Sequence, residues 1–123
     1  MAVLSADYVK VNKHNERIDI WFYNEEAKPF AVGEKMYALN EEAYMNGYNW
    51  DALFTYYLAQ RAPELLIGLE SDPEAGSYVA YYDRNAENEI KAQQLAELIV
   101  YLVENEEELY RLVREEGDQI QWD

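Results

Sequence analysis

The sequence predicts an α+β domain of two layers, in which an antiparallel or mixed sheet of about four strands carries about three helices. Three observations lead to this prediction: alternating apolar residues in short segments, apolar stripes of helical period in longer ones, and turn sequences between them. The chain has 123 residues, half of them apolar and 15% aromatic. A chain of this size supports one core, so we expect a single domain over residues 1–123.

The first two strands form a predicted hairpin. The segments YVKV (8–11) and RIDIWF (17–22) alternate apolar and polar residues and are rich in β-branched and aromatic side chains. The polar NKHNE between them is short enough for a hairpin loop. We expect Trp21 and Tyr23 to lie opposite the core or at an edge. The residues expected to face the core are Val9, Val11, Ile18, Ile20 and Phe22.

A second hairpin is predicted further along the chain. LLIGLES (65–71) alternates Leu65, Ile67 and Leu69, and SYVAYYD (77–83) supplies another strand. Between them SDPEAG is turn sequence, because proline presets φ and glycine accepts a positive φ.

A helix is predicted at residues 50–61, where apolar residues recur at i, i+3, i+4, i+7 and i+8. We expect Asn49 to cap it, Asp51 to complement the positive end of its dipole and Pro63 to stop it. The apolar stripe consists of Trp50, Leu53, Phe54, Tyr57 and Leu58.

Two more helices are predicted after Asn85. Asn105 precedes a run of glutamates, and Glu108 is placed to close a capping box, so a separate last helix is expected before Gly117. The apolar stripe of the first consists of Ile90, Leu95, Leu98, Ile99, Leu102 and Val103. The last helix carries Leu109, Leu112 and Val113.

The secondary structure of the stretch from Glu25 to Met45 is not decided by the sequence. Pro29 and Gly33 interrupt it, and a short strand or a helix around 36–39 fits the residues equally well. The order of the other elements is two strands, one helix, two strands and two helices. This order is typical of helices packed on one face of a sheet.

The chain is strongly acidic, with 25 Asp and Glu, ten Lys and Arg and a formal net charge of −15. Residues 1–61 hold nine acidic and six basic side chains, net −3, whereas residues 62–123 hold 16 and four, net −12. Such a field repels nucleic acid and anionic membranes and speeds encounter with cationic proteins. Acidic charge that only keeps the protein in solution is the alternative explanation.

The composition also indicates a compartment. No segment reaches the roughly 18 apolar residues of a membrane-spanning helix, and the first ten residues lack a signal-peptide pattern. The chain has no cysteine, which excludes disulfides and thiolate sites and suits a reducing environment. We therefore expect a soluble cytoplasmic protein.

Motifs for catalysis and cofactors are scarce. The single histidine, His14, is expected to be an ordinary solvated residue of the hairpin loop. Carboxylate pairs such as Asp72 with Glu74, or Glu41 with Glu42, arise by chance among 25 acids, so a small hydrolase is the last of three hypotheses. Phosphate-loop, dinucleotide and calcium-loop patterns are absent from the sequence. We predict no enzyme activity, no metal and no cofactor.

Tyrosine is unusually frequent, with 12 residues in the chain. Neighbours in a strand point to opposite faces, so Tyr81 and Tyr82 cannot both be buried against the same helices. Aromatic anchors with acidic steering charges are typical of protein recognition, although covering a sheet edge or forming a second buried layer explains the tyrosines equally well. The candidate partner-binding residues are Tyr44, Tyr48, Asp72, Glu74, Tyr82, Glu104, Glu106, Glu107 and Glu108.

Three motifs follow one another in a recognisable order. NGYNWDAL (46–53) precedes APELL (62–66) and DPEAG (72–76), then an aromatic-rich strand and a terminal pair of helices. In this order the chain resembles the Immunity protein 51 family of bacterial polymorphic-toxin systems, over about residues 40 to 115. The motif positions that carry over are Asn46, Gly47, Tyr48, Trp50, Asp72, Pro73, Glu74, Ala75 and Gly76.

The resemblance implies a cytoplasmic antidote that binds the toxin domain encoded beside it, without catalysis. A nuclease toxin has a cationic active surface, which the acidic half of this chain suits. The expected partner is a basic toxin domain, with neither nucleic acid nor membrane bound, and the chain is a monomer or homodimer. The second hypothesis is a non-enzymatic structural or adaptor module that self-associates through exposed aromatic residues.

Overall fold

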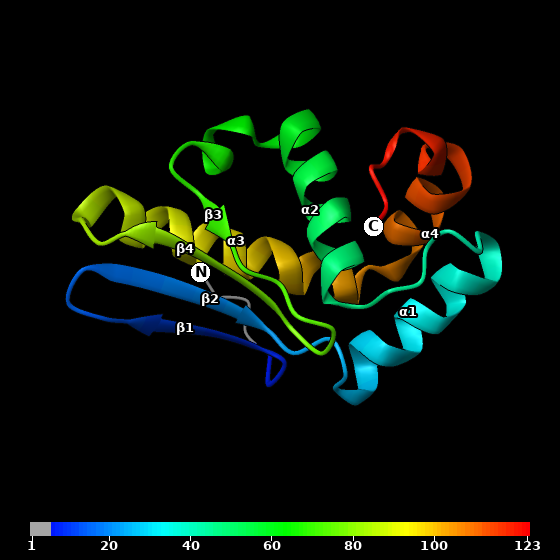
Figure 1. Ribbon diagram of the computed structural model, residues 1–123, viewed down its shortest axis with the longest axis horizontal. Helices are drawn as coiled ribbons and strands as arrows, with labels where there is room; N and C mark the ends of the chain where they lie inside the picture. The colour runs from blue at the N-terminus through cyan, green and yellow to red at the C-terminus, as the bar shows by residue number, and fades with distance from the viewer. Residues whose placement is uncertain (1–5) are drawn as a thin grey trace.

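The computed structural model describes residues 6–123 (Figure 1). It contains two strands, two helices, two more strands and two more helices, with 3₁₀ turns after α2 and α4. The elements are β1 (Val9–Lys13), β2 (Arg17–Phe22), α1 (Ala27–Leu39), α2 (Gly47–Arg61), η1 (Pro63–Leu66), β3 (Glu70–Ser71), β4 (Tyr78–Asp83), α3 (Ala86–Glu104), α4 (Glu106–Glu115) and η2 (Gly117–Gln119). The predicted α+β class is confirmed.

The four strands form one antiparallel sheet in the order β1-β2-β4-β3. Along β2 and β4 the residues of one face are fully buried, and they pair as Ile18 with Tyr82, Ile20 with Ala80 and Phe22 with Tyr78. Helix α3 packs across this face against β1, β2 and β4. The opposite face carries Trp21 and Tyr23, as predicted, with their rings stacked at 6.0 Å.

The helices divide into two groups. Figure 1 shows α3 running along the sheet, with α2 beside it, while α1 and α4 lie together beyond one end of the sheet. The acidic segment 104–108 falls where α3 passes into α4, and Glu106 at the start of α4 pairs there with lysines of α1. This junction therefore places the most acidic part of the sequence at the helical end of the molecule.

Phe22 lies at the centre of an aromatic core. Its ring makes edge contacts with Tyr8, Trp50 and Phe54, at centroid distances of 6.0, 5.0 and 5.6 Å. All five residues of the predicted stripe in α2 are buried. Edge-to-face aromatic pairs add stability beyond the burial of their area, so this cluster joins β2 firmly to α2.

Residues 25–45, whose secondary structure the sequence did not decide, contain helix α1. Pro29 lies in the first turn, where a missing backbone N–H costs no hydrogen bond, so it does not interrupt the helix. Gly33 is buried, and a Cβ there would lie 3.0 Å from the Cβ of Met45. Both residues that were expected to interrupt this region are therefore compatible with the helix.

The predicted strand at 65–71 is largely wrong. Pro63 starts the 3₁₀ turn η1, Gly68 has a φ of 79°, and only two residues, Glu70 and Ser71, pair with β4. Ile67 is 69% exposed, so it does not face the core. Three alternating apolar residues were a weak strand signal, and the proline and glycine prevented a longer strand.

Two predicted caps are also wrong. Asn46, rather than Asn49, caps α2: its Oδ1 accepts a 3.0 Å hydrogen bond from the Asn49 backbone N–H. The side chain of Asn105 donates to the carbonyl of Tyr101 at 2.8 Å, so it closes the end of α3 and forms no capping box with Glu108. In α3 the predicted stripe is buried except for the exposed Ile90 and the half-buried Leu98.

Replacing Gly47 with alanine is expected to lower the free energy of unfolding by about 3 kcal/mol. A Cβ at Gly47 would overlap the carbonyl oxygens of Glu74 and Ser77, which are backbone atoms and cannot turn away. Urea denaturation measures the loss. Gly68→Ala is the control, because Gly68 has open surroundings and should lose only about 1 kcal/mol through its positive φ. A Gly47→Ala variant as stable as the wild type would contradict this contact.

Candidate protein-binding surface

The two turn-forming motifs of the sequence meet in space. The Gly47 N–H donates to the carbonyl of Ala75 at 2.9 Å, and the Asn24 side chain donates to the same carbonyl at 3.2 Å. Asp72 and Glu74 are exposed in this turn. The turn 72–76 therefore supports the start of α2, and its two acidic side chains remain accessible.

Tyr44 and Tyr48 line two different hollows near the start of α2. Tyr44 is 63% exposed, and its ring makes an edge contact with Tyr37 of α1 at 5.9 Å. Tyr48 is 41% exposed and lines a different hollow, between α2 and the C-terminal tail, together with Trp122. The two tyrosines predicted to bind a partner are both accessible, but they do not form one patch.

Tyr82 is not a surface residue, so its predicted role in partner binding is wrong. Its side chain is fully buried, its hydroxyl donates to the carbonyl of Leu65 at 2.5 Å, and burial raises its pKa to about 12. Tyr81 takes the opposite face, where the guanidinium of Arg17 lies 4.4 Å from its ring centroid. The prediction that the pair divides between two faces was right, but the exposed member was chosen wrongly.

Two of the four candidate glutamates are held in ion pairs. Glu106 lies 2.8 Å from Lys28 and 3.9 Å from Lys35, both on α1, and the hydrogen bond from Lys28 lowers its pKa. Glu108 lies 2.6 Å from Arg111, one turn further along α4. The Glu106 pairs fix α4 to α1, and Glu108 also lies 4.0 Å from Arg61 on α2, so both residues have a structural role.

The side chains of the other two glutamates are more exposed to solvent. Glu107 is exposed and has no ion pair with any residue from 6 to 123. Glu104 is exposed and accepts a 2.6 Å hydrogen bond from the neutral hydroxyl of Tyr8. Glu104 and Glu107 are therefore the best candidates for steering charges at the α3–α4 junction.

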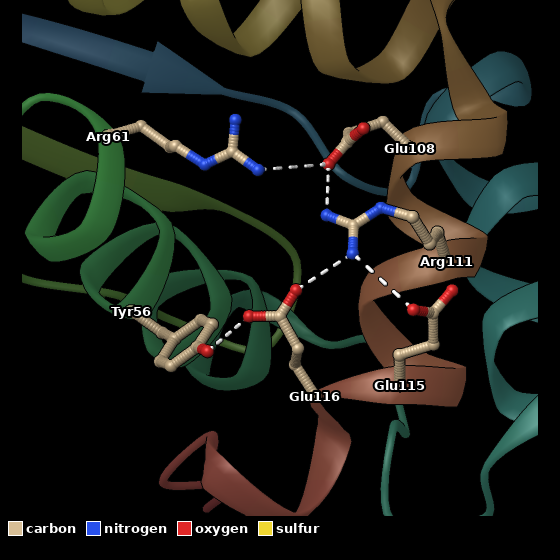
Figure 2. A network of polar contacts seen from close by, with 6 residues as sticks. All are labelled: Tyr56, Arg61, Glu108, Arg111, Glu115 and Glu116. Atoms are coloured by element: carbon tan, nitrogen blue, oxygen red, sulfur yellow. Dashed lines mark hydrogen bonds and ion pairs between the residues drawn. The ribbon is translucent and has the colours of Figure 1, made fainter.

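A polar network joins α4 to α2, and it is centred on Arg111 (Figure 2). Arg111 lies 2.6 Å from Glu108, 2.9 Å from Glu116 and 3.9 Å from Glu115. The members on α2 are Tyr56, which donates to Glu116 at 2.5 Å, and Arg61, which lies 4.0 Å from Glu108. Because its carboxylates are already matched by internal donors, we interpret this network as a connection between helices.

The network should make stability depend on pH below about 4.5. Hydrogen bonds from Tyr56 and then Arg111 lower the pKa of Glu116 from its ordinary value of 4.5. A lowered pKa contributes stability above the ordinary value, and this contribution is lost as the pH falls through the folded-state pKa. We expect Glu116→Gln to cost up to about 1 kcal/mol at pH 7 and less at pH 3, as measured by urea denaturation at both pH values.

Glu115→Gln is the matched control for this prediction. Glu115 is 62% exposed and lies 3.9 Å from Arg111, so its replacement should leave stability nearly unchanged at both pH values. An equal loss for Glu116→Gln at pH 7 and pH 3 would contradict the linkage.

The comparison with protein families decides what kind of chain this is. The model of one family, described as Immunity protein 51, matches residues 9–118. The chain belongs to the Immunity protein 51 family. This match confirms the resemblance seen in the sequence and supports an immunity role in general. Neither a search of curated proteins nor a search of solved structures found a match.

The region that matches Immunity protein 51 extends from the first residue of β1 into η2. It therefore includes the N-terminal hairpin, which carried little of the sequence resemblance. It also includes α1, the helix that the sequence left open. The sheet and all four helices described here thus belong to the part shared with the family.

A groove of about 350 Å³ separates α1 of this Immunity protein 51 chain from the connection to α2. Phe30, Tyr37 and Tyr44 line it, and Asn24 lies among the lining residues. Sequence reasoning missed Phe30 and Tyr37 because α1 was not assigned. Their spacing of seven residues was the available signal, since residues i and i+7 lie on one face of a helix.

Three further observations concern metal binding, membrane-spanning helices and the single histidine. Among residues 6–123, no group of three or more His, Asp or Glu side chains is arranged to hold a metal ion. In the same range, no helix combines the length and apolar character required to cross a bilayer. His14 is exposed, and its Nε2 lies 2.9 Å from Asp19, which also pairs with Arg17. This contact joins the β1–β2 turn to β2.

Proposed function

We propose that this chain is an immunity protein of a polymorphic toxin system, which binds and neutralises a cognate, basic toxin domain in the cytoplasm. The interaction is a non-catalytic protein–protein contact. The observation that carries the proposal is the family match over residues 9–118. The family implies that the partner is a protein toxin. The negative charge of this chain supports the proposal that the toxin is basic.

Internal ion pairs involve only a minority of the acidic side chains. Six of the 25 acidic side chains take part in ion pairs within residues 6–123: Asp19, Glu89, Glu106, Glu108, Glu115 and Glu116. The others leave a large negative potential, which raises the rate of encounter with a cationic surface. Such a field suits a protein that must capture a basic toxin quickly.

Co-expression tests the proposal directly. The chain is expressed with the toxin domain encoded beside it, and growth is compared with that of cells that carry the toxin domain alone. We expect growth to be rescued and a one-to-one complex to be recovered by size-exclusion chromatography. Loss of rescue with a correctly folded chain would overturn the proposal.

Self-association is the alternative function, and the sheet offers one observation in its favour. β1 is an edge strand, because within residues 6–123 only β2 pairs with it. An open edge can pair with a second copy, although Lys10 and Lys13 on β1 are of the kind that discourages this. Sedimentation velocity of the purified chain distinguishes the functions: a stable homodimer without toxin favours the adaptor module.

A further inference from the structure

The groove beside α1, lined by Phe30, Tyr37 and Tyr44, is a surface feature that the fold does not require. These rings are 52%, 49% and 63% exposed. Each would be more stable in contact with other apolar groups, and all three surround one hollow. Exposed aromatic rings gathered in this way are typical of a surface that receives a partner's side chain.

The groove is also acidic. Glu25 and Glu34 lie among its lining residues, and neither has an ion pair with any residue from 6 to 123. The two lysines of α1, Lys28 and Lys35, lie close to Glu106 of α4 instead. Two carboxylates beside aromatic rings therefore lack an internal cation, and this arrangement is complementary to a positive side chain.

An unpartnered acceptor adds to this arrangement. Asn24 lines the groove and is only 3% exposed. Its Nδ2 donates to the carbonyl of Ala75, which fixes the orientation of the amide, and its Oδ1 has no hydrogen-bond partner among the described residues. A buried acceptor without a partner is costly. Oδ1 is itself covered, so a small side-chain adjustment must accompany any donor that reaches it.

We propose that this groove receives an arginine side chain from a protein partner and, resting on the proposed function, that the partner is the toxin domain. A guanidinium stacks on aromatic rings and presents five N–H donors in one plane. It can therefore contact Tyr37 or Tyr44 through its face while it donates to Glu25 or Glu34 through its edge. A lysine ammonium lacks the planar face and the fork of donors, so arginine fits the groove better.

Toxin affinity tests the role of the groove. Isothermal titration calorimetry of the full chain with the toxin domain compares Tyr44→Ala and Glu34→Gln with Tyr101→Ala and Glu87→Gln. Each control replaces an exposed residue of the same type elsewhere on the surface. We expect each groove variant to lose about tenfold in affinity and each control to stay within about twofold of the wild type. Thermal unfolding of all four confirms that they are folded.

A second measurement needs no toxin. N-acetylarginine amide is titrated into the ¹⁵N-labelled chain, with N-acetylnorleucine amide as the uncharged control. We expect saturable shift changes at the side-chain amide of Asn24 and the backbone amides of Glu34 and Tyr44, at millimolar ligand. Equal shifts with both amides, or none with the arginine amide, would overturn the inference.

The two experiments separate the inference from the proposed function. If the toxin binds the wild type and both groove variants equally well, the inference is wrong and the immunity function stands. If no toxin complex forms but the arginine amide saturates the groove, the proposed function fails and the arginine-binding chemistry stands, with the toxin excluded as partner.

Discussion

Replacing Phe22 with alanine is expected to lower the free energy of unfolding by about 3–5 kcal/mol. Phe22 is fully buried, and its ring contacts Tyr8, Trp50 and Phe54. Removing it leaves a cavity where β2, α2 and the N-terminal segment meet, and the surrounding rings can close it only in part. Urea denaturation followed by far-UV circular dichroism measures the loss, which is a large fraction of the stability of a typical domain.

Phe30→Ala is the matched control. The same atoms are removed, but Phe30 is 52% exposed, so stability should change by no more than about 0.5 kcal/mol. A loss below about 1 kcal/mol for Phe22→Ala would show that the aromatic core is not organised around this residue. A stable Phe30→Ala variant would also agree with a groove that serves binding rather than folding.

Neutralising Glu104 and Glu107 together is expected to slow association with the toxin domain on the order of threefold to tenfold. Both side chains are exposed at the α3–α4 junction, and neither is held by an ion pair among the described residues. Glu104→Gln keeps an acceptor for the Tyr8 hydroxyl, so the fold should not change. Stopped-flow fluorescence at physiological salt gives the association rate constant.

A control pair removes the same charge elsewhere. Glu16 in the β1–β2 turn and Glu87 in the first turn of α3 are exposed, and α3 places Glu87 about 26 Å from Glu104. This separation exceeds the Debye length of about 8 Å at physiological salt. We therefore expect the control pair to slow association less. Equal effects of the two pairs would show that only the total charge matters.

The sequence was most informative where long patterns agreed. The stripe in α2 extends over two turns, and every member is buried. A wide apolar face is removed from water only when the helix packs that face against the core. Residues 65–71 offered only three alternating positions, and Pro63 and Gly68 imposed a 3₁₀ turn and a left-handed residue instead. Short patterns are decided by local backbone chemistry.

The candidate surface was harder to predict, because it depends on tertiary contacts. Which of Tyr81 and Tyr82 faces solvent is fixed by the pairing of Ile18 with Tyr82, and a sequence does not contain that register. Likewise, Glu106 and Glu108 resemble Glu107 in the sequence, but the distant Lys28 and the nearby Arg111 engage the former two. The exposed charges could be distinguished from the structural ones only after α1 and α4 had been placed together.

The salt dependence of association tests the central claim most directly, namely that a negative potential at the helical end brings this chain to a basic toxin domain. The association rate constant is measured by stopped flow from 20 to 500 mM salt, a range over which screening removes most long-range attraction. We predict a decrease of about tenfold or more. A rate constant that stays flat across this range would contradict the claim.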